Sequence, residues 1–89
     1  MSDYKADIHK ELYEVSKAGD CARVRELLEA GADPHKYKNE HGCTALHSAA
    51  ENGHRDVVII LMQAGADPTL QDDEGRTPID VAKNTEIAW

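Results

Sequence analysis

The stretch Gly31-Ala32-Asp33-Pro34 occurs a second time in the chain, as Gly65-Ala66-Asp67-Pro68, at an offset of 34 residues. The agreement extends upstream, since eight of the sixteen positions of 19–34 are identical in 53–68. Further downstream the offset falls to 33, which places one extra residue within 35–41. A fixed period of this length is typical of proteins built by stacking copies of one small structural unit.

Each unit is predicted to be a pair of helices followed by an extended loop. Thr44 is a favourable N-cap for a first helix, and Gly53 ends that helix because glycine readily takes a left-handed conformation. A second helix is predicted over 57–64, and Gly65 stops it. An extended loop follows, since the residue before Pro68 avoids the helical region. The small residues that let successive helices stack closely are Ala45, Ala49, Ala50 and Ala64.

The composition points to one small acidic domain. The chain has 89 residues, with 10 Lys and Arg against 17 Asp and Glu, so its formal net charge is −7. This charge repels phosphate groups and argues against nucleic acids and anionic membranes as partners. Leu, Ile and Val total only 16 residues, which by itself favours disorder. The repeat reverses that interpretation, because a stack of units buries thin layers between neighbours.

The N-terminal stretch 1–7 is charged and has no apolar core, so it does not resemble a secretory signal. No apolar run approaches the roughly 18 residues needed to cross a bilayer. We therefore expect an intracellular protein, in the cytoplasm or the nucleus, whose two cysteines remain thiols. No internal disulfide is expected, because Cys21 and Cys43 are predicted at opposite ends of a helix roughly 13 Å long.

The central unit reads Gly42-Cys43-Thr44-Ala45-Leu46-His47-Ser48-Ala49-Ala50, then Gly53-His54, then Gly65-Ala66-Asp67. This pattern resembles the ankyrin repeat, although Ala45 stands where that family usually has proline. The resemblance covers about residues 8–89. It implies an all-α fold, a short solenoid of helix–turn–helix units joined by β-turn loops. The expected divisions of this single domain are a capping repeat (1–38), a full central repeat (39–71) and a partial repeat (72–89).

The first unit has features of a terminal repeat. Arg23 and Arg25 occupy the positions that are apolar in the central unit, as expected for a face that meets water. Apolar residues at helical spacing are predicted to extend the first helix towards the N-terminus and cover the core. They are Tyr4, Ile8, Leu12 and Val15.

The third unit begins well and is then incomplete. Thr77 is a good N-cap, and Pro78 suits the first position of a helix. No second helix is predicted after it. Three alternatives remain open: Ile79, Ile87 and Trp89 form an improvised cap, the chain is cut from a longer array, or its open end associates weakly with another chain.

Catalysis, cofactors and metals are not expected. The chain has no Gly-rich phosphate loop, no Cys-x-x-Cys pair and no Gly-x-Ser-x-Gly elbow. Cys43 and His47 are four residues apart, with His41 nearby, which is a spacing compatible with metal ligands. The family resemblance instead implies that His47 braces the turn before its helix. It also implies structural roles for His54, at a Gly-His corner, and for Asp72, in a loop, whereas His9 and His35 receive no role.

The resemblance implies a non-catalytic protein-interaction module, acting as a scaffold, adaptor or inhibitor. Its partner is expected on the loop tips and on the concave face formed by the first helix of each unit. Residues at these places that neither cap, turn nor pack are available for recognition. The predicted contact residues are Tyr37, Glu40, His41, Cys43, Ser48, Glu51, Asn52, Asp73, Glu74, Arg76, Asn84 and Thr85.

Acidic residues dominate this surface, so we expect a protein partner with a basic segment. Two interpretations of Tyr37 remain open, because tyrosine is favoured in binding hot spots but its ring also suits packing against a neighbouring loop. The alternative function is structural. In that case the chain is an end fragment of a larger ankyrin-repeat protein and binds nothing by itself.

Overall fold

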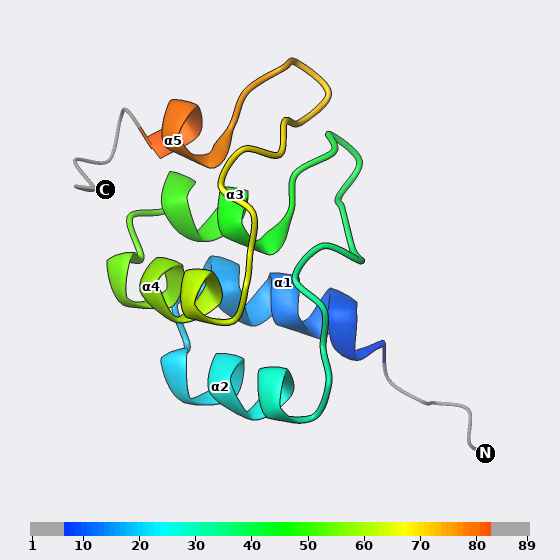
Figure 1. Cartoon of the computed structure of the whole chain (residues 1–89), viewed down its shortest axis with the longest axis vertical. Coiled ribbons are helices and arrows are strands. Elements are labelled where there is room, and N and C mark those ends of the chain that lie inside the picture. The colour runs from blue at the N-terminus through cyan, green and yellow to red at the C-terminus, as the bar shows by residue number, and fades with distance from the viewer. Residues whose placement is uncertain (1–6, 83–89) are drawn as a thin grey trace.

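The computed structural model describes residues 7–82 (Figure 1). These residues form five helices: α1 (Ile8–Ala18), α2 (Cys21–Glu29), α3 (Ala45–Glu51), α4 (Arg55–Gln63) and α5 (Pro78–Val81). The described part of the chain contains no β-strand. The predicted all-α class is therefore confirmed.

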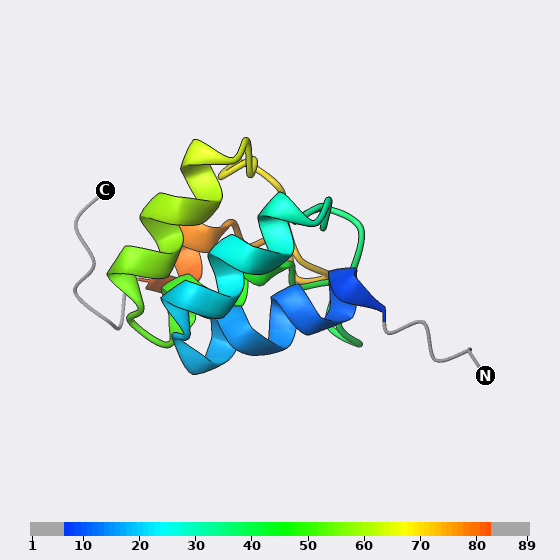
Figure 2. The same cartoon turned by 90° about the horizontal axis from the view of Figure 1, so that it is seen from below.

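The helices are arranged in two layers (Figures 1 and 2). In one layer α3 lies between α1 and α5, and in the other α2 packs against α4. Short corners join α1 to α2 and α3 to α4, so each pair contributes one helix to each layer. The long connections leave the helices at the same end of the stack (Figure 1). This is the helix–turn–helix stacking that the repeat predicts.

The helices begin at the capping residues expected from the sequence. Thr44 and Thr77 cap α3 and α5, each accepting a hydrogen bond from the backbone N–H of the third residue of its helix. Pro78 occupies the start of α5, where its missing N–H costs no helical hydrogen bond. Asp7 and Asp20 cap α1 and α2 through their carboxylates. These side chains accept hydrogen bonds from backbone N–H groups at the helix starts, which have no partner within the helix.

Successive units also contact each other at their corners. Gly19 ends α1 with φ 81°, a left-handed conformation. A Cβ added to Gly19 would lie 2.7 Å from Nδ1 of His54. The His54 ring is itself held by a hydrogen bond from Nε2 to the carbonyl oxygen of Lys17, at 2.9 Å. Because Gly19 has no side chain, the imidazole of His54 fits beside it and links the corner between α3 and α4 to the end of α1.

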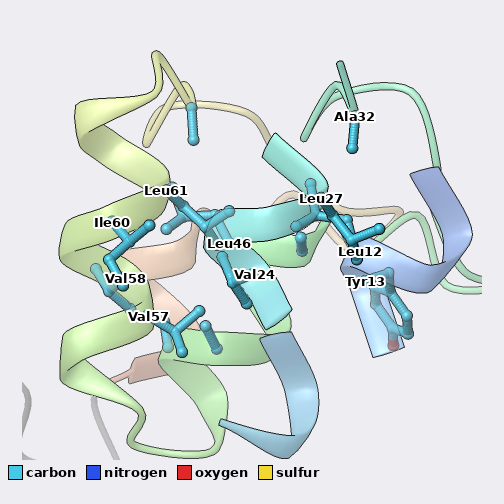
Figure 3. Packing of buried hydrophobic residues seen from close by; sticks show 14 of the residues in the cluster. Leu12, Tyr13, Val24, Leu27, Ala32, Leu46, Val57, Val58, Ile60 and Leu61 are labelled. Carbon is cyan, nitrogen blue, oxygen red and sulfur yellow. The ribbon is translucent and has the colours of Figure 1, made fainter. Parts of the chain in front are cut away.

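The core is a thin layer between the two sets of helices (Figure 3). Fully buried apolar side chains come from each of the five described helices: Leu12 from α1, Val24 from α2, Leu46 from α3, Val57 and Leu61 from α4, and Pro78 from α5. The helix α3 adds buried alanines, which allow α1 and α5 to approach it on both sides. Small residues at these positions explain how a chain with few large apolar side chains builds a continuous core.

The N-terminal end of the stack is partly as predicted. Leu12 is fully buried, and Ile8 and Val15 are partly buried against the core. Tyr4 lies outside the described residues. On the outer side of this unit, Nη2 of Arg23 pairs with Glu11 at 2.7 Å, and this contact links α2 to α1. The charged terminal face therefore contributes an ion pair between helices.

At the other end, α5 is short and Ile79 is 43% exposed. Ile87 and Trp89, the other members of the proposed cap, lie outside the described residues. The three alternatives for this end of the chain therefore stay open.

Candidate protein-interaction surface

Two equivalent turns form the tips of the long connections. We call residues 39–43 the first loop tip and 72–76 the second. In the first, Asn39 Oδ1 accepts hydrogen bonds from the backbone N–H groups of His41 and Cys43, at 2.8 and 2.9 Å. In the second, Asp72 Oδ1 accepts from those of Glu74 and Arg76, both at 2.9 Å. Each tip is thus a β-turn organised by one side chain of its own.

Asp72 has the structural role that the family resemblance implies. Its carboxylate is buried, and its Oδ2 lies 3.0 Å from Nε of Arg76. Burial acts to raise the pKa of Asp72, but the hydrogen bonds from Arg76 and Glu74 and the charge of the guanidinium together hold it below its ordinary value. Asp72 is therefore an ionised anchor inside the turn.

The two loop tips are joined directly to each other. The backbone N–H of Asp73 donates to the carbonyl oxygen of His41 at 2.9 Å. The tips also approach closely at Gly42, where an added Cβ would lie 3.0 Å from the backbone nitrogen of Asp73. The side chains on both tips consequently project from one connected backbone.

Several predicted contact residues are exposed on this connected edge. The side chains of Glu40, His41 and Glu74 are 84%, 69% and 72% exposed. Asp73 is exposed as well. Arg76 supplies positive charge, but its guanidinium lies 3.0 Å from Asp72 and 3.6 Å from Glu74. The part of the edge available to a partner is therefore mainly acidic.

The expected exposure of Cys43 is wrong. The residue is only 7% exposed, because the hydrogen-bonded turn directs its side chain inwards, and its sulfur lies 3.9 Å from Oδ2 of Asp72. Burial first, and then the charge of Asp72, raise the pKa of the Cys43 thiol. Cys43 therefore belongs to the interior of the first loop tip. Both Cys43 and Cys21 are free thiols in this structure.

On the first helices, the predicted concave face is only partly exposed. Ser48 is buried between the packed helices, so its predicted availability to a partner is wrong. Glu51 and Asn52 are exposed at the end of α3, and Asn52 Nδ2 donates to the carbonyl oxygen of Ser48 at 2.8 Å. Asn84 and Thr85, the equivalent residues predicted in the third unit, lie outside the described residues.

Tyr37 is partly buried, and its ring packs against a helix and not against a neighbouring loop. Its ring lies against that of Tyr13 in α1, with ring centroids 5.2 Å apart and an interplanar angle of 56°. Tyr13 in turn accepts a hydrogen bond through its hydroxyl from Asn39 Nδ2, at 2.8 Å. The first connection, which contains the extra residue, thus packs against α1 through an aromatic contact. The same tyrosine of α1 is hydrogen-bonded to the first loop tip and supports it.

His47 braces the turn as the resemblance implies. Its Nδ1 accepts a hydrogen bond from the backbone N–H of Thr44 at 3.2 Å, and its Nε2 lies 2.8 Å from the carbonyl oxygen of Arg76. Both ring nitrogens are therefore engaged with protein atoms. Within residues 7–82 there is no group of three or more His, Cys, Asp or Glu side chains placed to hold a metal ion.

Two histidines that received no role from the sequence make specific contacts. His9 and His35 each accept a hydrogen bond from the backbone of a distant loop, namely from Asp33 and Asp67, both at 2.9 Å. His9 lies at the start of a helix and His35 in a loop, and no periodic pattern in the sequence distinguishes either of them from an exposed polar residue. Only the three-dimensional stacking of the units brings these groups together.

Comparison with known sequences identifies the repeat. The family described as "Ankyrin repeats (3 copies)" matches residues 12–88. The chain belongs to the ankyrin-repeat family. Ankyrin repeats are a protein-interaction module. None of the helices described here is long and apolar enough to cross a membrane.

Related ankyrin-repeat sequences occur within much longer proteins. The chain is 39% identical over 71 residues to the mouse 2-5A-dependent ribonuclease, covering 80% of this chain and 10% of that protein. It is 34% identical over 76 residues to mouse ankyrin repeat domain-containing protein 40, covering 85% and 21%. It is also 38% identical over 77 residues to the human ARF GTPase-activating protein GIT1, covering 86% and 10%. The chain thus spans a tenth to a fifth of these relatives.

Proposed function

We propose that this chain is a non-catalytic protein-binding module whose partner contacts the joined loop tips and the exposed end of α3. The observation that carries the proposal is the hydrogen bond between the backbone of Asp73 and that of His41. It connects two turns that are each already organised by Asn39 or Asp72. A surface ordered before binding loses less conformational freedom on association, which favours affinity.

The chemistry of the surface favours a partner with a basic segment. Glu40, Asp73 and Glu74 project from the tips, and Glu51 lies at the end of α3. The positive charge of Arg76 is largely engaged by neighbouring carboxylates. Complementary charge raises the rate of encounter and selects the partner. Tyr37 contributes indirectly in this proposal, by supporting the first tip through Tyr13.

The proposal is tested with a displayed library of short random peptides selected on the immobilised chain. We expect the selected peptides to be rich in Lys and Arg, and their binding to weaken as salt is raised. The variant Glu40→Lys/Glu74→Lys reverses two exposed charges of the tips and should lose these peptides. The matched control Glu14→Lys/Glu29→Lys makes the same change in net charge on exposed residues of α1 and α2, and should retain them.

Two results would contradict this assignment. The first is equal loss of the peptides in the two double variants, which shows that net charge alone drives binding. The second is selection of peptides with no excess of basic residues. Arg76 is left unchanged in both variants because it anchors the second tip through Asp72, so its removal would disturb the fold.

A structural role within a larger protein is the second candidate. It is favoured by the relatives, in which the matching segment is a tenth to a fifth of the whole protein. On this hypothesis the isolated chain either self-associates or has a low melting temperature, because Ile79 is exposed at the end of the stack. Sedimentation showing a monomer, together with one cooperative thermal transition, would count against it.

The proposed location is a reducing intracellular compartment, the cytoplasm or the nucleus. The two free thiols, one of them buried beside Asp72, support it.

A further inference from the structure

Two equivalent backbone donors in the stack are each satisfied by a histidine ring. The N–H groups of Asp33 and Asp67 follow the second helices of the first two units, in the repeated Gly-Ala-Asp-Pro sequence. The N–H of Asp33 donates to His9 Nδ1, and that of Asp67 donates to His35 Nε2, both at 2.9 Å. His9 belongs to α1, whereas His35 lies in the connection before α3. In each of the two units, the equivalent backbone N–H thus donates to a histidine from an earlier part of the stack.

These contacts form a continuous series. The Asp33 carboxylate accepts a hydrogen bond from the backbone N–H of His35 at 2.9 Å. One unit later, Asp67 Oδ1 accepts from the backbone N–H and the hydroxyl of Thr69, at 2.8 and 2.6 Å. We call this series the histidine ladder; its members are His9, Asp33, His35, Asp67 and Thr69. It runs from the start of α1 across the connections that follow α2 and α4, and so spans two units.

The ladder requires neutral histidines in defined tautomers. A ring nitrogen that accepts a hydrogen bond from an N–H group must carry a lone pair. His9 therefore holds its proton on Nε2, and His35 holds its proton on Nδ1. Nδ1 of His35, which carries the proton in this tautomer, lies 3.5 Å from Oδ1 of Asp33.

We propose that the histidine ladder is a proton-sensitive link between repeats, which weakens when His9 and His35 become charged. Protonation replaces each accepting lone pair with an N–H group, which then faces the backbone N–H of Asp33 or Asp67. Histidine is the side chain whose charge ordinarily changes between about pH 5 and pH 8. The link concerns the stacking of the units, goes beyond partner binding and does not depend on it.

The neighbouring carboxylates attract a charged ring but, at their exposure, offset only part of the lost hydrogen bonds. His35 faces the Asp33 carboxylate from its own connection and the Asp67 carboxylate from the next one. Near His9, Asp7 caps the same helix and Asp33 lies on the contacting loop. The side chains of His35 and Asp33 are 38% and 44% exposed, and ion pairs at such exposure stabilise little.

Nitrogen-15 NMR of the full chain tests the tautomers directly. At about pH 7.5 we expect His9 as the Nε2–H form and His35 as the Nδ1–H form. On acidification to about pH 5.5, the amide protons of Asp33 and Asp67 should exchange with solvent about tenfold faster than the intrinsic pH trend predicts. The opposite tautomer at His35, or unchanged protection of the Asp67 amide, would overturn the proposal.

A matched pair of variants tests the effect on stability. His35→Gln keeps an oxygen acceptor but does not titrate, whereas His41→Gln removes an exposed histidine whose one described side-chain contact is with Glu40. Between about pH 7.5 and pH 5.5, the folding equilibrium constant of the wild type and of His41→Gln should fall by about tenfold more than that of His35→Gln. An identical pH dependence in all three proteins would overturn the proposal. If His35→Gln does not fold, the NMR measurement on the wild type decides alone.

Discussion

At the scale of single residues, the loop tips show how one side chain sets the surroundings of another. Asp72 accepts two backbone hydrogen bonds and pairs with Arg76, and its charge in turn acts on the Cys43 thiol. Cys43, which the sequence predicts on an exposed tip, is therefore buried, and the pKa of its thiol is raised. Because the thiolate is the reactive form of cysteine, this environment lowers the reactivity of Cys43.

We expect Cys21 to be alkylated several times faster than Cys43 in the native protein at neutral pH. Cys21 is partly exposed at the first position of α2, whereas Cys43 is buried beside a carboxylate. A time course with iodoacetamide, followed by peptide mass spectrometry, measures both rates in one sample. In concentrated urea the two rates should become similar. A native rate at Cys43 equal to that at Cys21 would contradict the burial described here.

At the scale of elements, the helix pairs are held by their corners and caps as well as by their apolar faces. The Gly19 corner illustrates this, since the imidazole of His54 occupies the space that a side chain on residue 19 would need. That imidazole also reaches back to the carbonyl oxygen of Lys17 near the end of α1. The second corner thus satisfies a carbonyl group that the first helix leaves without a partner.

Gly19→Ala is expected to destabilise the chain more than Gly31→Ala. Both glycines have positive φ, so each substitution costs about 1–2 kcal/mol of backbone strain. At Gly31 no atom lies within 4 Å of the added Cβ, whereas at Gly19 the ring of His54 must move and lose its hydrogen bond. The difference between the two variants should be about 1 kcal/mol, measured by urea unfolding.

The double variant Gly19→Ala/His54→Ala provides the control for this corner. With the ring removed, alanine at position 19 should cost no more than alanine at position 31. The two substitutions should therefore be non-additive, as expected for residues in contact. Additive effects would show that the glycine and the imidazole act independently.

At the scale of the whole molecule, stability depends on contacts between successive units. The helix α3 packs against α1, α4 and α5, and the loop tips and the corners add polar links between the same units. Carboxylates also organise the loops of these units, and hydrogen bonds within the loops help to hold the pKa values of Asp72 and Asp67 below their ordinary values. The stability of the stack is consequently linked to pH.

We expect the free energy of unfolding to fall as the pH drops below about 4, near the ordinary pKa of aspartate. A carboxyl group whose pKa is lower in the folded state contributes stability above its unfolded pKa and loses it as the pH falls through the folded value. Asp72→Asn should cost about 1–3 kcal/mol at neutral pH and should flatten this acid dependence. Urea unfolding at several pH values measures both effects.

Asp73→Asn serves as the matched control for Asp72→Asn. It makes the same change in net charge one residue away, but at an exposed side chain. Its acid dependence should follow that of the wild type. If both variants flatten the curve equally, the effect comes from overall charge and not from the buried carboxylate of Asp72.

The repeat, the helix pairs and their ends can all be predicted from local patterns in the chain. A period near 33 residues, the caps at Thr44 and Thr77 and the glycine stops are local signals, because each depends on the backbone preferences of a few adjacent residues. The exposed acidic residues Glu40 and Glu74 were predictable for the same reason, since they occupy turn positions with no capping or packing role.

The accessibility of the predicted surface residues, and the pairing of polar groups between units, depend instead on how the units stack. Cys43 and Ser48 are buried, Cys43 beside Asp72 of the other loop tip, and His35 accepts a hydrogen bond from Asp67 of the following unit. These outcomes depend on the distance and rotation between stacked units, to which many residues contribute small amounts. No short stretch of sequence specifies that geometry, so accessibility and long-range hydrogen bonds emerge only when the units are placed together.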